Sequence, residues 1–123
     1  MAAPNLAVAA NIYARQVAVG IGTTEYVGIL TNTSNSGKVL KVDNIRVVNV
    51  NGAFNTDVTV GWSTVGAATT FRVASTIPVP ADSALIVADK DSGIYLEENT
   101  RIVARAANAD YLEIHIKYEE LSS

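Results

Sequence analysis

Apolar and polar residues alternate along two segments of the chain. In segment 112–119 the apolar positions are Leu112, Ile114, Ile116 and Tyr118, and in segment 58–63 they are Val58, Val60 and Trp62. A repeat of two residues places successive side chains on opposite faces of a β-strand. Both segments are therefore predicted to be strands that bury one face in a hydrophobic core and expose the other to solvent.

Seven further segments have the composition of strands. Valine, isoleucine and threonine make up 37 of the 123 residues, and these β-branched residues favour a pleated sheet over a helix. The segments are 12–19, 24–31, 38–50, 69–77, 84–88, 95–96 and 101–106, with turn-forming residues between them. In segment 38–50, Leu40 and Val42 have the opposite parity from Ile45 and Val47. We therefore expect a β-bulge near Asp43 and Asn44, where the strand bends or changes sheets.

The order of these segments predicts the fold class. No segment shows a helical period, and no internal repeat is visible. Pro78 and Pro80 lack a backbone N–H, so segment 78–80 is expected to be an extended crossover rather than a central strand. We predict an all-β protein, a single antiparallel β-sandwich that is jelly-roll-like and has about eight strands, over residues 12–123.

The first eleven residues form a distinct segment. Residues 1–11 carry no charged side chain, and five of them are alanine. So short a segment cannot build a core of its own. We interpret residues 1–11 as an N-terminal arm that a neighbouring subunit holds in place; in the alternative, it packs along its own sandwich. The residues predicted at this interface are Pro4, Leu6, Val8 and Ile12.

The distribution of charge argues against nucleic acid as a partner. The nine basic residues are scattered among twelve acidic ones, so no basic face is expected to neutralise phosphates, and we expect no nucleic acid as partner.

No charge-free apolar run approaches the roughly 18 residues that span a bilayer. The start of the chain lacks the positive charges of a secretory signal, so we expect no membrane contact and no leader.

The low charge content also points to contact with other proteins. Charged residues make up 17% of the chain, against a usual share of about 25%. The 18 alanines, 11 threonines and 10 asparagines must therefore cover much of the surface. Such small side chains lose little entropy when they are immobilised at an interface. We predict a subunit of a homo-oligomer or of a larger assembly.

The sequence offers little for catalysis. It contains no cysteine and one histidine, His115, which the alternation places on the solvent-facing side of its strand. We expect no enzymatic activity and no cofactor. Trp62 and Phe71 fall on apolar positions and are predicted to lie in the core. An aromatic platform that stacks on sugars, and hence a carbohydrate-binding module, is the alternative.

One acidic stretch raises the question of a calcium site. Asp89 and Asp91 lie close to Glu97 and Glu98, and carboxylate oxygens bind Ca²⁺. The spacing does not match an EF-hand loop. We predict that these side chains make hydrogen bonds within turns and hold no metal, with a looser Ca²⁺ site as the alternative.

A set of loop and strand segments carries a family resemblance. The segments are 77–85 (IPVPADSAL), 95–102 (YLEENTRI), 104–107 (ARAA) and 118–120 (YEE), together with 20–24 (GIGTT) and 58–62 (VTVGW). As a pattern spanning residues 18–120, they resemble small virion structural proteins of tailed bacteriophages. Asn99 departs from this pattern, since such proteins often have glycine there.

The resemblance implies a non-enzymatic structural role in the virion. It implies the major capsid protein or other virion proteins as partners. Our main hypothesis is a capsid decoration or cement protein that stabilises the shell through subunit interfaces. The alternative is a component of the neck, tail or baseplate.

Overall fold

The computed structural model describes residues 11–67 and 69–122. Within this part of the chain, each of the nine predicted segments overlaps a strand. The strands are β1 (Asn11–Ile21), β2 (Val27–Asn32), β3 (Lys38–Asn49), β4 (Thr56–Thr64), β5 (Phe71–Val79), β6 (Ala84–Ala88), β7 (Ile94–Leu96), β8 (Thr100–Ala106) and β9 (Leu112–Ser122). A one-turn 3-10 helix, η2 (Lys90–Ser92), lies between β6 and β7.

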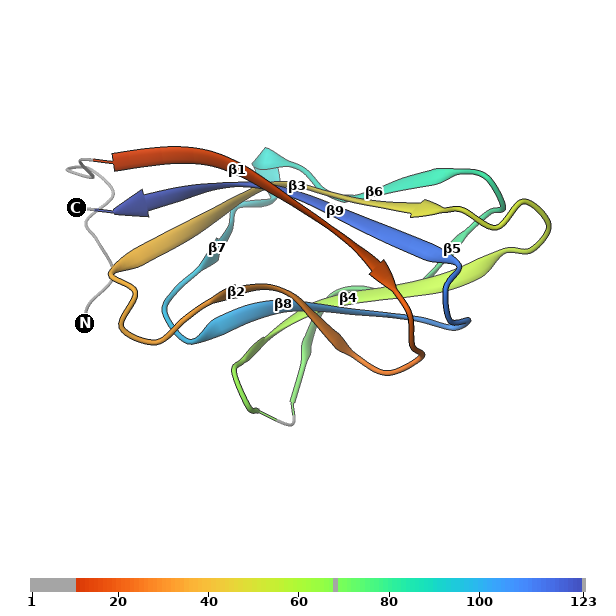
Figure 1. Cartoon of the computed structure of the whole chain (residues 1–123), viewed down its shortest axis with the longest axis horizontal. Coiled ribbons are helices and arrows are strands. Elements are labelled where there is room, and N and C mark those ends of the chain that lie inside the picture. The colour runs from red at the N-terminus through yellow and green to blue at the C-terminus, as the bar shows by residue number, and fades with distance from the viewer. Residues whose placement is uncertain (1–10, 68, 123) are drawn as a thin grey trace.

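The strands form two antiparallel sheets that pack face to face (Figure 1). One sheet has the order β1-β9-β3-β6, with β7 also paired to β3, and the other has the order β2-β8-β4-β5. Strands from the two ends of the chain pair with each other, β1 with β9 and β2 with β8, while β4 and β5 pair in the middle. This winding is the jelly-roll form of the β-sandwich, which has eight strands in its simplest form. The predicted fold is confirmed, with the three-residue β7 as the ninth strand.

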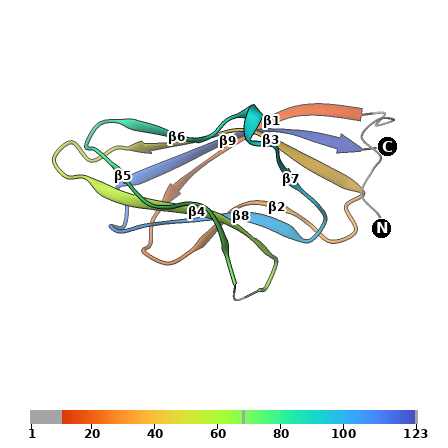
Figure 2. The ribbon, with the colours of Figure 1, turned by 180° about the vertical axis from the view of Figure 1, so that it is seen from behind.

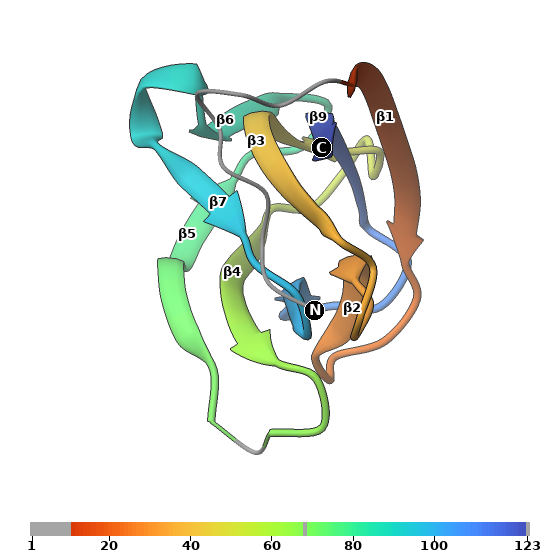
Figure 3. The ribbon, with the colours of Figure 1, turned by 90° about the vertical axis from the view of Figure 1, so that its left-hand side faces the viewer.

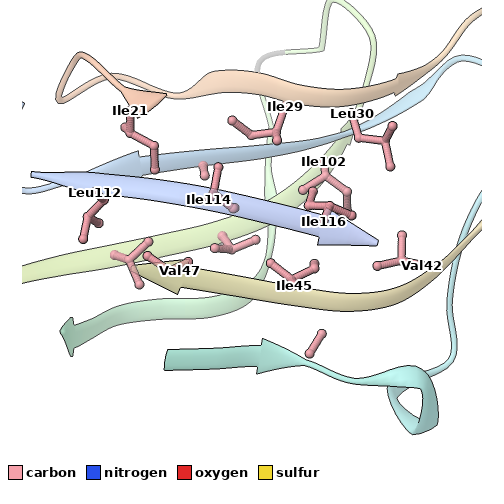
Figure 4. Close-up of a cluster of buried hydrophobic side chains, with 14 of the residues drawn as sticks. Ile21, Ile29, Leu30, Val42, Ile45, Val47, Ile102, Leu112, Ile114 and Ile116 are labelled. Atoms are coloured by element: carbon pink, nitrogen blue, oxygen red, sulfur yellow. The ribbon is translucent and has the colours of Figure 1, made fainter. Parts of the chain in front are cut away.

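The hydrophobic core lies between the two sheets. In β9, Leu112, Ile114 and Ile116 are at most 1% exposed, and they belong to one cluster with Val58 and Ile102 of the other sheet (Figure 4). Burying each such side chain contributes about 1.5–3 kcal/mol to stability. The alternation in the sequence therefore predicted the inner face of β9 correctly.

The change of parity in β3 is accommodated by a β-bulge, as predicted. Val42 pairs with Tyr118 and Asn44 pairs with Lys117, which leaves Asp43 as an extra residue in β3. One extra residue reverses the parity of everything that follows it. Val42 and Ile45, on either side of the bulge, are both buried in the core.

The structure corrects two strand boundaries. Pro78 lies within β5, opposite Asp57 of β4, rather than in a crossover outside the strands. The strand tolerates this proline because β5 is the edge of its sheet, where one side of the backbone needs no partner. The second strand begins at Val27, because the hydroxyl of Thr23 accepts from the Glu25 backbone N–H (3.2 Å) and holds a turn there.

Two buried asparagines tie together segments at the two ends of the sandwich. The Asn32 side chain donates to the carbonyls of Lys38 (2.8 Å) and Leu96 (2.9 Å). The Asn49 side chain donates to the carbonyls of Phe54 (3.0 Å) and Val79 (2.9 Å). Each amide therefore donates to two carbonyls from different parts of the chain, and so its own buried N–H groups are paired.

Candidate interaction surface

One side of the sandwich is open between the sheets. Among the described strands, β5 pairs only with β4 and β7 pairs only with β3, so each is an edge. Figure 3 shows both edges on the side of the molecule opposite β1. In the view from behind, β7 descends from one layer toward the other (Figure 2). Between Trp62 and Val73 on one side and Ile94–Leu96 on the other lies a hollow of about 500 Å³.

Four large apolar side chains are exposed around this hollow. Trp62 is 39% exposed, Phe71 57%, Val73 36% and Tyr95 46%. The rings of Trp62 and Phe71 stack, with their centroids 5.1 Å apart and their planes at 30°. Trp62, Val73 and Tyr95 line the hollow itself, and Phe71 lies next to it through this stacking. We call these four residues and the hollow the aromatic hollow.

The prediction that Trp62 and Phe71 lie in the core is therefore wrong. Trp62 shares the parity of Val58 and Val60, and it lines the same hollow as the buried Leu96. It thus faces the space between the sheets, as the alternation indicated. The strand of the opposite sheet that lies across the hollow from Trp62 is β7, which has three residues. In the described part of the chain this short strand leaves the Trp62 ring 39% exposed. Parity predicted the face correctly but not whether that face is covered.

The lining of the aromatic hollow is mainly apolar. Among the described residues that line it, Glu97 has the one charged side chain. Two hydroxyls of the lining already have partners, since Thr100 donates to the Glu97 carbonyl (2.7 Å) and Ser92 donates to Asp89 (3.4 Å). The surface therefore suits an uncharged apolar partner better than a densely hydroxylated one.

The predicted arm falls largely outside the described residues. This applies to Pro4, Leu6 and Val8, for which the interface prediction stays a prediction. Ile12 lies in β1 and is 63% exposed, paired with Leu121 of β9. Asn11, which we assigned to the arm, is the first residue of β1 and pairs with Ser122.

His115 lies on the outer face of its sheet, as predicted. It pairs with Ala18 of β1 and Arg46 of β3, and it is half-buried. With Arg46, Ile86 and neighbouring residues it borders a shallow depression of about 370 Å³.

The acidic loop forms turns, as predicted. A carboxylate oxygen of Asp89 accepts from the Asp91 backbone N–H (3.0 Å) and caps η2. For Glu98 the prediction of a bond within its own turn is wrong, because its carboxylate accepts from the backbone N–H groups of Asn35 and Gly37, in the loop before β3, both at 3.1 Å. Over residues 11–67 and 69–122, no three His, Cys, Asp or Glu side chains come together as metal ligands.

A small charged cluster lies where β1, β9 and β3 meet. Glu120 forms ion pairs with Arg15 (Nε to Oε2, 3.2 Å) and Lys38 (Nζ to Oε2, 3.4 Å). Burial raises the pKa of the neighbouring Tyr118, the Glu120 carboxylate raises it further, and the Arg15 guanidinium lowers it.

In the described part of the chain, no helix has the length and hydropathy to cross a membrane.

The Tyr118 phenol gives a pH-dependent prediction. Because its pKa is raised in the folded state, its contribution to stability is full below the unfolded pKa of about 10 and is lost as the pH rises through the folded pKa. We expect Tyr118→Phe to remove a step above pH 10 from the tyrosine titration followed by phenolate absorbance. Glu120→Gln should shift that step to lower pH. If the signal removed by Tyr118→Phe lies below pH 10, the assignment is wrong.

Comparisons with known proteins show the fold. No protein-family model and no curated protein sequence matches the chain. A chain of the disulfide-linked pili that form Bacillus endospore appendages is 15% identical, with a TM-score of 0.53, and the match covers 91% of this chain and 89% of that one. A chain from the capsid of the Helicobacter pylori bacteriophage KHP30 is 12% identical, with a TM-score of 0.52 and coverage of 93% and 90%. A chain of the T13 IBDV viral particle is 7% identical, with a TM-score of 0.53 and coverage of 93% and 32%.

The coverage values separate these structures into two kinds. The appendage chain and the phage capsid chain are matched over nearly their whole length, so each is about the size of this protein. The IBDV chain contains the same sandwich as one part of a larger molecule. The present sequence has no cysteine and therefore cannot form the disulfide links of the appendages.

Proposed function

We propose that this protein is a structural subunit of a virus particle. The observation that carries the proposal is the aromatic hollow: an exposed apolar surface on a chain of low charge is typical of a protein that is covered by a partner. The resemblance to small virion proteins of tailed bacteriophages supports the virion as its location. The likeness in fold to a phage capsid chain of similar size is in keeping with this role.

Within the particle, we propose a decoration or cement protein on the capsid. A small sandwich adds to a shell by burying its exposed apolar surface against the major capsid protein and against copies of itself. Each copy then raises the free energy needed to open the shell. The role requires no catalysis and no nucleic-acid or membrane partner. A component of the neck, tail or baseplate is the alternative, since the same contacts would serve there.

Labelled particles test this proposal. We expect an affinity tag after Ser123, marked with gold, to appear over the whole head of purified virions in electron micrographs. A label confined to the neck or tail would favour the alternative location. Particles without label, from cells that contain the tagged chain, would contradict the virion role. Untagged virions treated with the same gold reagent are the control.

Carbohydrate binding is the second candidate function. It is favoured by one observation, the partial exposure of the Trp62 and Tyr95 rings at the hollow. Aromatic rings with a free face bind sugars through stacking. Phe71 stacks on Trp62, however, and the lining hydroxyls named above are already engaged. Because Trp62 is the sole tryptophan of the chain, its fluorescence would report glycan binding directly.

A further inference from the structure

We propose that residues 1–10 of a neighbouring copy occupy the aromatic hollow and add a strand to the free edge of β5. This inference rests on the proposed role as a subunit of an assembly and names the contact that would join its copies. The occupant would be a second copy of this chain, bound through an extended and uncharged segment.

The chemistry of the hollow selects an apolar peptide. Its exposed side chains are Trp62, Phe71, Val73 and Tyr95, and Glu97 is the one charged residue among its described lining. Burying a charged group in such a place would cost free energy, because the lining offers few polar partners. Residues 1–10 contain no charged side chain, and Leu6 and Val8 are spaced to point toward the same face of an extended strand.

The edge of β5 supplies hydrogen bonds for an added strand. β5 pairs with β4 on one side, and the other side faces the open end of the sandwich. At Val73 this edge borders the hollow, which Trp62 of β4 also lines. An extended peptide that pairs with such an edge gains backbone hydrogen bonds, while alternate side chains enter the adjacent hollow.

The placement of the first strand favours exchange between copies. β1 begins at Asn11, at the edge of its sheet, and β9 and β3 lie between it and β7. To fill its own hollow, the chain would have to turn out of the line of β1 next to Asn11 and pass across β9 and β3. Residues 6–10 (LAVAA) contain none of the glycine, proline, asparagine or aspartate residues that form tight turns. Ten residues that continued the line of β1 in an extended form would span about 33 Å and leave their own sandwich.

Single-cysteine variants of the full chain test the contact. The protein has no cysteine of its own, so each introduced thiol is unique. Leu6→Cys and Tyr95→Cys chains, one carrying a size tag, are co-expressed and mildly oxidised. We expect a disulfide-linked heterodimer on a non-reducing gel, with a yield at least about tenfold above the control pair, since a bound segment holds the thiols at a high effective concentration. In the control pair, Glu113→Cys on the exposed outer face replaces Tyr95→Cys.

Each outcome separates the possibilities. Equal yields from the two pairs would overturn the proposal. If a chain with both Leu6→Cys and Tyr95→Cys gives only an internally linked monomer, the hollow holds its own arm and the second-copy contact is wrong. Light scattering of the wild-type chain gives its oligomeric state, which tests the contact proposed here separately from the proposed role as a structural subunit. A multimer without the cross-link overturns only this contact, whereas a monomer absent from particles also contradicts the structural role.

Discussion

Replacing Asn49 by aspartate is expected to lower the free energy of unfolding by about 3–5 kcal/mol. The Asn49 side chain is 1% exposed, and its amide group donates to the carbonyl oxygens of Phe54 (3.0 Å) and Val79 (2.9 Å). A carboxylate puts an oxygen where both donors now lie. The carbonyls of Phe54 and Val79 then lose these hydrogen bonds, and a charge is buried beside them.

The loss should depend on pH in a defined direction. Burial raises the pKa of the introduced carboxyl above its unfolded value of about 3.9. A group with a raised folded pKa stabilises the fold least when it is ionised, so stability falls as the pH rises above the unfolded pKa. Urea unfolding at pH 4 and pH 7 should therefore give a smaller difference from the wild type at pH 4.

A matched control lies two residues away. The Asn51 side-chain oxygen accepts from the backbone N–H groups of Ala53 (2.8 Å) and Phe54 (2.9 Å). A carboxylate accepts these bonds at least as well, so Asn51→Asp is expected to change stability by less than about 0.5 kcal/mol. If the two variants lose equal stability, the donor role of Asn49 is wrong.

The strands and their faces followed from local pattern because β-strands repeat every two residues. The alternation of Leu112, Ile114 and Ile116 predicted the core face of β9, and the parity change in β3 predicted the bulge at Asp43. Both signals are local. They depend on residues within one strand, so no knowledge of the partner strands is needed.

The aromatic hollow could not be predicted in the same way. Whether Trp62 is covered depends on β7, which is three residues long and lies more than 30 positions later in the sequence. The buried roles of Asn32 and Asn49 were missed for the same reason, because their partners Leu96 and Val79 come from distant segments. One available signal was the apolar pair Phe71 and Val73 a few residues before Pro78, since proline is typical of a sheet edge.

Gly61→Ala should give the second large effect and couple stability to the hollow. A Cβ atom built on Gly61 would lie 2.5 Å from the carbonyl oxygen of Phe71 and 2.6 Å from Cγ2 of Thr70. The first contact is with backbone, which no side-chain rotation can relieve. The β4–β5 pair must separate at this point, and we expect a loss of about 3 kcal/mol.

The separation would displace the residues that border the hollow. Gly61 precedes Trp62, whose partner across the strands is Phe71, so the stacked rings should move apart. Thermal unfolding measures the stability, and the emission maximum of the sole tryptophan reports the exposure of Trp62 at temperatures where the variant is folded. Gly20→Ala is the matched control, since a Cβ there meets nothing within 4 Å. It should leave both the unfolding temperature and the emission unchanged. A Gly61→Ala variant that melts like the wild type would mean that β5 has room to shift, and the hollow would then be a less rigid binding surface than its geometry indicates.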